Sequence, residues 1–455
     1  MITHVFILIF LTLFYVHANQ YPSTCIISGH KGIIRFDHSD STQAHAAESK
    51  VWWFQDLSNE PLFAITGATN GEYFMFGSQS TMDIWKVKND RSSGTSTDDN
   101  GWKTGINNEN IVAAGVPIAA NSANYPATAS SNTRIWSMAY ATGLDMWLAS
   151  TYMLSIFYSE NDGSSWTYSN LVKGSANRFT STETSYIHHI YYNEAKFIQY
   201  GINELVAVGN QGCVFVSNDG KSWTGIKCLS ASNHGMEWVT YAKGRYIIAS
   251  FDGKIYYSSK DRTLSSSTTW HESTVVQATI SGVTGTVPFS DVSSRKYSVH
   301  YAEESGRIVI GMNGCLMYSD LNNDVIEWHL MANFDSNGGD GGKQFQTVGY
   351  YNDIWWAFGG NNGAGKLYYW TSTDNGENWN KNELTNNANQ GLNNNFGGGG
   401  FTGGMSVTCN VPPDKCSLTR DFWDVDNCCT DFSDSSCTKC EQDYKLNDCC
   451  PYRGL

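Results

Sequence analysis

Charged residues are scarce in this sequence: Asp, Glu, Lys and Arg together make up 16% of its 455 residues. Basic residues are the scarcer kind, so the formal net charge is −14 at pH 7. Phosphate backbones and anionic lipid surfaces repel a chain with this balance of charge. The composition therefore argues against nucleic acid as a partner and against binding to a membrane surface.

Long apolar runs are also lacking, except at residues 5–16, which are almost wholly apolar. Val16-His17-Ala18 then offers small residues at the −3 and −1 positions of a cleavage site, although the segment has no Lys or Arg at its start. The run is shorter than the ~20 residues that a spanning helix needs, which disfavours the alternative of a retained anchor. We predict a signal peptide at residues 1–18, a mature chain without a membrane span, and a secreted, extracellular protein.

Aromatic residues and glycine are abundant instead. The sequence contains 16 Trp, 25 Tyr, 21 Phe and 43 Gly. Aromatic side chains favour strands and Gly favours tight turns, so this composition indicates many short strands joined by turns. A helical bundle or a disordered chain has a different composition. The sequence therefore predicts an all-β protein.

The clearest local motif is Ser372-Thr373-Asp374-Asn375-Gly376-Glu377-Asn378-Trp379, which has the properties of a hairpin turn. In such a turn Asp374 accepts hydrogen bonds from the backbone, Gly376 takes a positive φ, and Trp379 starts the next strand. Weaker copies lie at residues 159–166 and 217–223. The turn residues of the three copies are Ser159, Asn161, Gly163, Trp166, Ser217, Asp219, Gly220, Trp223, Ser372, Asp374, Gly376 and Trp379.

The motif belongs to a repeat that runs through most of the chain, and each copy ends on a tryptophan. The marker residues are Trp102, Trp166, Trp223, Trp270, Trp328 and Trp379. Their separation is close to the ~40–50 residues of a four-stranded propeller blade. The opening segment makes a seventh copy, and residues 401–409 are a candidate for its missing innermost strand. We predict a β-propeller over residues 19–410 with seven four-stranded blades, six being the alternative.

The S-x-D-x-G-x-x-W pattern resembles the Asp-box, or BNR, repeat of the sialidase-like β-propeller superfamily. Residues 372–379 match in full, the copy at 159–166 has Asn161 in place of Asp, and the copy at 217–223 is one residue shorter. The resemblance implies that the boxes are structural turns on the face away from the ligand site. Asp219 and Asp374 are then not catalytic acids. The ligand site is expected on the opposite face, which carries the long connections 103–133, 167–185, 271–296 and 380–400.

The catalytic signature of that superfamily is missing. Sialidases carry an Arg-Ile-Pro motif and three arginines that clamp the substrate carboxylate. The nearest fragment here is Ile34-Arg35-Phe36-Asp37, without the proline, while Arg245 and Arg307 lie in matching Gly-Arg turns that indicate repeat structure. A glycosidase that uses a carboxylate pair stays open, and no catalytic residue is identified.

No metal or cofactor site is predicted. His188 and His189 are neighbours in an aromatic strand, where regular alternation would point them to opposite faces and prevent them from sharing a metal ion. We therefore interpret them as ordinary strand residues.

The 12 cysteines of a secreted chain indicate disulfides rather than metal ligands. Cys213 and Cys228 would face each other across the hairpin that contains the second box. Cys25 and Cys409 would join the two ends of the propeller. Seven cysteines follow Val411, so residues 411–455 are predicted to form a small cysteine-rich module held together by disulfides.

These observations favour a secreted, non-catalytic binding or adhesion protein. Its expected partner is a glycan or an extracellular protein, recognised through the loop face opposite the Asp-boxes. The alternative is a secreted glycoside hydrolase, either sialidase-like or with a carboxylate pair. Converging carboxylates or three arginines in the central hollow would favour the enzyme, and an aromatic, uncharged hollow would favour binding.

Overall fold

The computed structural model describes twenty stretches of the chain: residues 24–29, 32–37, 52–53, 67–77, 84–88, 102–103, 135–151, 155–176, 186–229, 235–251, 253–260, 263–275, 298–302, 305–311, 315–321, 326–333, 345–351, 354–359, 367–384 and 406–410. The predicted signal peptide at 1–18 and the predicted module at 411–455 lie outside them. The described part is all-β apart from a short α-helix and two 3-10 turns.

The described strands form seven sheets, and within four of them the strand order follows the chain order throughout. The first half of the chain contributes β1 (Thr24–Gly29), β2 (Gly32–Asp37), β3 (Trp52–Trp53), β4 (Gly67–Thr69), β5 (Tyr73–Gly77), β6 (Ile84–Lys88), β7 (Trp102–Lys103), β8 (Ile135–Ala141), β9 (Met146–Thr151), β10 (Ile156–Ser159), β11 (Thr167–Tyr168), β12 (Asn170–Val172), β13 (Ile187–Tyr192), β14 (Leu205–Gly209), β15 (Cys213–Ser217) and β16 (Ser222–Cys228). The second half contributes β17 (Met236–Ala242), β18 (Arg245–Ser250), β19 (Ile255–Ser258), β20 (Trp270–Glu272), β21 (Thr274–Val275), β22 (Ser298–Ala302), β23 (Arg307–Gly311), β24 (Cys315–Ser319), β25 (Glu327–Asn333), β26 (Phe345–Tyr351), β27 (Ile354–Gly359), β28 (Leu367–Ser372), β29 (Asn380–Leu384) and β30 (Ser406–Asn410).

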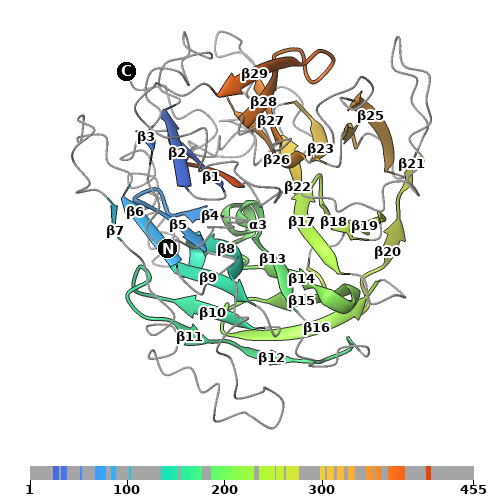
Figure 1. Cartoon of the computed structure of the whole chain (residues 1–455). Helices are drawn as coiled ribbons and strands as arrows, with labels where there is room; N and C mark the ends of the chain where they lie inside the picture. The colour runs from blue at the N-terminus through green and yellow to red at the C-terminus, as the bar shows by residue number, and fades with distance from the viewer. Residues whose placement is uncertain are drawn as a thin grey trace, which may run out of the picture.

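The sheets stand side by side around a common centre (Figure 1). One edge strand of each sheet is innermost, and each innermost strand lies against that of the next sheet, in the order β4, β8, β13, β17, β22, β26, β30 and back to β4. Neighbouring strands within a sheet are antiparallel, with two exceptions at outer edges. The fold is β-propeller-like.

The two ends of this ring of strands meet in one sheet. Its strand order is β3-β2-β1-β30, so the last described strand pairs with the first. The ladder places Cys25 opposite Cys409, and Cys409 is a disulfide-bonded cysteine. The side chain of Cys25 lies outside the described part, so the predicted Cys25–Cys409 bridge stays a prediction. The pairing supplies this sheet with its innermost strand and closes the ring of sheets.

Two outer strands cross from one sheet to the next. After leaving its own sheet, the chain pairs β12 in parallel with β16, and it pairs β21 in parallel with β25 in the same way. A hydroxyl adds to the link in the first case, because Ser169 Oγ donates to the carbonyl oxygen of Gly220 at 2.8 Å. These strands turn two of the expected four-stranded sheets into five-stranded ones.

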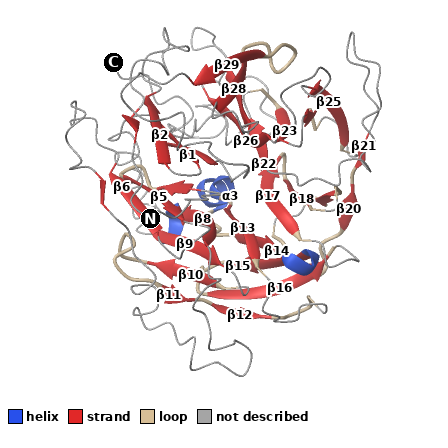
Figure 2. Ribbon diagram, viewed as in Figure 1, coloured by secondary structure: helices blue, strands red, loops and turns tan. Residues whose placement is uncertain are grey.

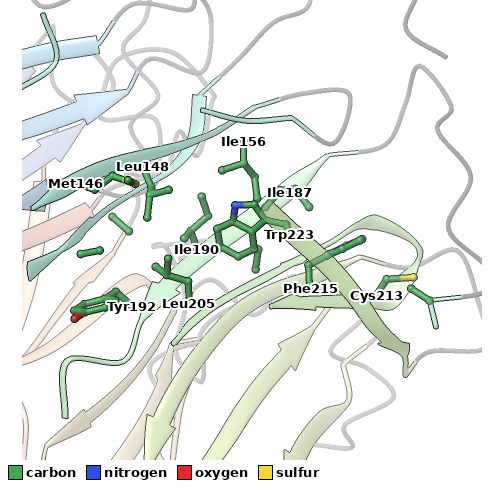
Figure 3. Close-up of a cluster of buried hydrophobic side chains, with 14 residues drawn as sticks. Met146, Leu148, Ile156, Ile187, Ile190, Tyr192, Leu205, Cys213, Phe215 and Trp223 are labelled. Atoms are coloured by element: carbon green, nitrogen blue, oxygen red, sulfur yellow. The ribbon is translucent and has the colours of Figure 1, made fainter. Parts of the chain in front are cut away.

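The core fills the spaces between neighbouring sheets. One large cluster lies between the sheets of β8 and β13, and Leu148, Ile190 and Trp223 are fully buried or nearly so within it. Figure 3 shows the Trp223 ring in the middle of these side chains. Marker tryptophans Trp166 and Trp328 are also completely buried, in the corresponding clusters. The repeated tryptophan is therefore a packing residue at these positions.

The turn predicted at Ser372–Trp379 has the hydrogen bonds that its sequence indicates. Asp374 Oδ1 accepts from the Ser372 hydroxyl at 2.7 Å and from the backbone N–H of Asn378 at 2.9 Å. Gly376 has a φ of +86°, and its N–H donates to Ser372 Oγ at 2.8 Å. Trp379 Nε1 donates to the Gly376 carbonyl at 2.9 Å. Burial alone would raise the pKa of Asp374, but these hydrogen bonds lower it below its ordinary value.

The other two boxes form the same turn. In the copy at 159–166, Asn161 Oδ1 accepts from the Ser165 N–H at 2.9 Å, and Ser159 Oγ accepts from the Gly163 N–H at 2.9 Å. In the shorter copy, Asp219 Oδ1 accepts from the backbone N–H groups of Lys221 and Ser222, and hydrogen bonds lower its pKa despite its partial burial. The polar side chains of the boxes are thus occupied by the turns themselves.

The boxes also make hydrogen bonds to side chains outside the turn, and the first of these lie within the same sheet. The residue after the box Asp or Asn has a positive φ in two copies, Asp162 at +51° and Asn375 at +56°. Its side chain accepts from a buried indole of its own sheet, Trp147 Nε1 at 3.1 Å and Trp355 Nε1 at 2.9 Å respectively.

Cations from the preceding sheet bind the carbonyl oxygens of these same residues. Lys86 Nζ donates to the carbonyl of Asp162 at 2.8 Å, and Arg307 Nη1 donates to that of Asn375. Arg307 also pairs with Asp320 and lies 4.0 Å from the centroid of the Tyr318 ring. Arg245 lies over the Tyr257 ring in the matching position. Both arginines therefore have contacts within the repeat.

The sequence did not predict α3 (Glu194–Tyr200), a helix inserted between β13 and β14. It starts after Asn193, whose side chain accepts from the Lys196 N–H, and it ends at Gly201, which has a φ of +63°. In Figure 2 it projects onto the centre of the ring of strands. It contacts the 3-10 turn η4 (Thr142–Leu144) that follows β8, so it lies at the end of the propeller-like body that carries the boxes.

Candidate functional site

The end opposite the boxes is where the innermost strands begin. The boxes connect the third and fourth strands of a sheet, and the connection from the first to the second strand lies at the same end. The start of each innermost strand and the connection from the second to the third strand lie at the other end, which we call the loop end. The long connections 103–133, 167–185, 271–296 and 380–400 lie mostly outside the described part.

Four innermost strands carry a β-bulge at the loop end, at the same place in each. The register shifts between Ile135 and Ser137, between Ile187 and His189, between Met236 and Trp238, and between Phe345 and Thr347. The extra residue is Trp136, His188, Glu237 or Gln346. Bulges re-aim a side chain and are common beside binding sites. Four of the seven sheets therefore supply one re-aimed residue each at the loop end.

Three of the extra residues come from adjacent sheets and meet. The Trp136 and His188 rings are edge to face, with centroids 5.1 Å apart. His188 Nδ1 lies 3.5 Å from Glu237 Oε2. The Tyr186 ring stacks on Trp136 at 5.0 Å, and His188 Nε2 is 2.8 Å from Asn210 Oδ1. These five residues and Trp238, which follows Glu237, are called the loop-end cluster below.

The loop-end cluster has a buried layer and a layer that reaches the surface. Trp136 and His188 are buried, whereas Tyr186, Asn210, Glu237 and Trp238 are half-buried. Three buried polar atoms in it, Trp136 Nε1, His188 Nδ1 and Glu237 Oε1, make no hydrogen bond. Such atoms are rare in protein interiors and mark places where water or a ligand completes the bonding. The cluster therefore combines aromatic surface with unused donor and acceptor groups.

A disulfide supports the cluster from one side. Cys213 and Cys228 are bonded, which confirms the predicted bridge across β15 and β16. Just before Cys213, the 3-10 turn η5 (Asn210–Gly212) carries Asn210, and the Leu229 N–H donates to the Gly212 carbonyl at 2.8 Å. The bridge thus fixes the turn that holds Asn210 against His188.

Glycine is required beside the cluster. A Cβ on Gly235 would lie 2.9 Å from both His188 Nε2 and Asn210 Oδ1. The absence of a side chain there lets β17 approach the His188–Asn210 pair closely.

Charge is sparse at the described starts of the innermost strands. At the described starts of the innermost strands, Glu237 is the one carboxylate, and there is no Lys or Arg. These residues supply neither the pair of carboxylates of a glycosidase nor the three arginines of a sialidase. Among the described residues there is also no group of three or more potential metal ligands.

A polar residue at or near the start of three innermost strands links neighbouring sheets. Ser137 Oγ accepts from the Ile190 N–H at 3.0 Å, and Ser298 Oγ accepts from the Val348 N–H at 2.9 Å. In the sheet of β13 this position is His189, whose Nδ1 accepts from the Val239 N–H at 3.4 Å. Its ring stacks on Trp238 with centroids 4.0 Å apart.

The predicted regular alternation of His188 and His189 is wrong, because the bulge lies at His188. Both rings contact residues of β17 instead of pointing to opposite faces: His188 approaches Glu237, and His189 approaches Trp238. Burial lowers the pKa of His189 to about 3. His189 is therefore neutral near pH 7 and can accept that bond.

Replacing His189 by serine is expected to reduce the acid sensitivity of folding. Below pH about 6.5 the histidine is protonated in the unfolded chain but not in the folded chain. The free energy of unfolding therefore falls by ~1.4 kcal/mol for each pH unit of acidification. His189→Ser should remove about 2 kcal/mol of the loss in unfolding free energy between pH 7 and pH 5, measured by urea denaturation. Some loss should persist, since burial lowers the pKa of His300 to about 4. An unchanged difference between the two pH values would contradict the assignment.

Comparison with known proteins gives no family. No protein-family model matches the chain, and no curated protein matches it. Solved structures with a similar course of chain include YCF48 bound to a D1 peptide (TM-score 0.44, 15% identity, covering 76% of this chain and 92% of that one). Another is Sqt1 of Saccharomyces cerevisiae (TM-score 0.45, 11% identity, covering 80% of this chain and 81% of that one). A third is U3-55K (TM-score 0.43, 10% identity, covering 74% of this chain and 88% of that one). We draw no functional argument from similarities of this size.

No helix in the described part of the chain is both long and apolar enough to cross a lipid bilayer.

Proposed function

We propose that this chain is a secreted, non-catalytic binding protein that recognises glycans through the loop-end cluster of a seven-bladed β-propeller. The observation that carries the proposal is the meeting of three bulge residues, Trp136, His188 and Glu237, from adjacent sheets. A sheet needs no such residue for its own pairing. Its repetition at one end of the molecule is what a binding surface built on a rigid scaffold requires.

The surface layer of the cluster has the chemistry that sugar rings need. Tyr186 and Trp238 are half-buried aromatic side chains, and each has one face covered, by Trp136 and His189 respectively. Each ring therefore offers a supported platform rather than a flexible side chain. Glu237 and Asn210 beside them provide a carboxylate and an amide for hydroxyl groups.

Secretion is supported by the predicted signal peptide at residues 1–18 and by the disulfide between Cys213 and Cys228. The absence of a catalytic signature in the sequence supports binding without turnover. The single carboxylate at the described strand starts favours the same conclusion over the alternative of a glycoside hydrolase.

The test is a glycan array probed with the purified mature protein, followed by assays for released reducing ends on every sugar bound. We expect binding without cleavage. Tyr186→Ala should weaken the binding about tenfold, because it removes one platform ring. Tyr158→Ala is the matched control, since Tyr158 is a half-buried tyrosine at the box end and its loss should leave binding unchanged.

Cleavage of a bound sugar would overturn the non-catalytic assignment and favour the glycosidase. Binding to no glycan would overturn the proposed ligand class and leave an extracellular protein as the partner to test.

A further inference from the structure

The polar groups of the loop-end cluster restrict the kind of sugar that fits. Glu237 is half-buried, its Oε1 makes no hydrogen bond, and its Oε2 has His188 Nδ1 at 3.5 Å. A carboxylate in this position needs hydrogen-bond donors, because desolvating it without them is unfavourable. A ligand that brings hydroxyl groups supplies such donors, whereas a ligand that brings a carboxylate, sulfate or phosphate places like charges side by side.

The described residues around the cluster do not compensate for an anionic ligand. No Lys or Arg occurs at the described starts of the innermost strands, and the whole chain carries a net charge of −14. Recognition of a sugar carboxylate normally uses a bidentate arginine. Arg245 and Arg307 begin the second strands of their sheets at the box end, where each lies over a tyrosine ring.

The aromatic side chains do not form a cage for a cation. The Tyr186 ring is parallel to Trp136 within 16°, and the Trp238 ring is parallel to His189 within 22°. A quaternary ammonium is held by several ring faces that surround it. Here each half-buried ring has a face covered by its neighbour, so the pair forms two platforms. Platforms suit flat, uncharged rings that also carry hydroxyl groups.

We infer that the loop-end cluster takes a neutral saccharide, whose hydroxyl groups donate to the Glu237 carboxylate while a sugar ring lies on Tyr186 or Trp238. This inference rests on the proposed function and names its ligand class. Trp136 Nε1 and His188 Nδ1 are the groups that a hydroxyl or a bridging water can join to the same network. Sialic acid and uronic acids are excluded by the carboxylate.

The experiment compares neutral hexose and N-acetylhexosamine oligosaccharides with sialylated and uronate-containing ones, and includes choline as a cationic probe. The mature protein should bind neutral oligosaccharides alone. Glu237→Gln should weaken that binding at least tenfold, because a hydrogen bond to a charged acceptor becomes one to a neutral amide. Glu160→Gln is the matched control, since Glu160 is an exposed glutamate at the box end, paired with Lys221, and its replacement should have no effect.

The outcomes separate this inference from the proposed function. Preferred binding of acidic sugars or choline would overturn the neutral ligand class, and so would an unchanged affinity of a correctly folded Glu237→Gln protein. If acidic sugars bind and Tyr186→Ala weakens their binding, the proposed glycan recognition stands and only the neutral ligand class is wrong. If no sugar binds, the proposed function fails with it. Thermal melting of each variant shows whether a lost affinity reflects a lost fold.

Discussion

Replacing Glu204 by glutamine is expected to lower the free energy of unfolding by about 3–5 kcal/mol. Glu204 directly precedes β14 at the box end, away from the loop-end cluster. Glu204 Oε2 is 2.5 Å from Lys196 Nζ, and the Lys196 side chain is completely buried. The variant keeps the shape of the side chain but leaves the ammonium group without its counter-charge. Breaking one partner of a buried ion pair is costly for this reason.

The surroundings of this ion pair explain why both partners are needed. The Tyr246 hydroxyl donates to Glu204 Oε2, and the Leu264 N–H donates to Oε1 at 2.9 Å. Asn193, the cap of α3, donates from its side chain to the Tyr246 hydroxyl at 2.7 Å. Burial raises the pKa of Tyr246 well above its ordinary value, and the negative charge of Glu204 adds to the shift. The network joins α3 to the adjacent sheet of β17.

Control variants show whether the loss comes from the unpaired charge. Lys196→Met combined with Glu204→Gln removes both charges and should recover most of the stability. With the Lys196→Met single variant, the double-mutant cycle should then give a large coupling. Glu160→Gln breaks an ion pair whose side chains are 43% and 54% exposed and should cost no more than about 1 kcal/mol. Urea denaturation measures the wild-type protein and the four variants. A loss as small as that of Glu160→Gln would contradict the structural role given to Glu204.

Local sequence was sufficient for the turns and for the hairpin disulfide. Asp374, Gly376 and Trp379 do what their residue types indicate, because the hydrogen bonds that shape the turn lie within its eight residues. Cys213 and Cys228 could be paired because a hairpin fixes which residues face each other. The ring of sheets followed from repetition of the same turn.

The candidate site was missed because its contacts join residues that are distant in the sequence. Nothing in a single strand shows that Trp136, His188 and Glu237 meet, since each contact crosses from one sheet to the next. Strict alternation also gave the wrong orientation at His188, where the bulge adds a residue. A signal was present: aligning the innermost strands puts an unlike residue after the apolar start of each, as in Ile135-Trp136-Ser137 and Met236-Glu237-Trp238.

The short elements between sheets were missed for similar reasons. α3 has seven residues, and its stability comes from tertiary contacts such as the buried Lys196 rather than from helix propensity. Its local signals were an Asn193 cap and a terminal Gly201. β12 and β21 are three and two residues long, and their partners are set by the packing of the next sheet.

Replacing Trp223 by alanine is expected to destabilise the protein by about 3–5 kcal/mol, the usual cost of removing a large aromatic side chain from a core. Trp223 is completely buried in the cluster between the sheets of β8 and β13, among Leu148, Ile190 and Phe215 (Figure 3). Its Nε1 also donates to the Gly220 carbonyl at 3.0 Å, so the same side chain closes the box turn and fills the space between sheets.

Trp223→Phe separates these two contributions, because it keeps an aromatic ring in the core and loses the hydrogen bond to Gly220. Its expected cost is about 1–3 kcal/mol, from the unpaired carbonyl and the smaller ring. Trp379→Ala provides the comparison at a half-buried box tryptophan and should cost less than Trp223→Ala, since less apolar surface is lost. Equal losses at Trp223 and Trp379 in urea denaturation would mean that the indole hydrogen bond, which both residues make, matters more than burial. The expected order instead follows burial, which makes the tryptophan that ends each repeat primarily a contact between neighbouring sheets.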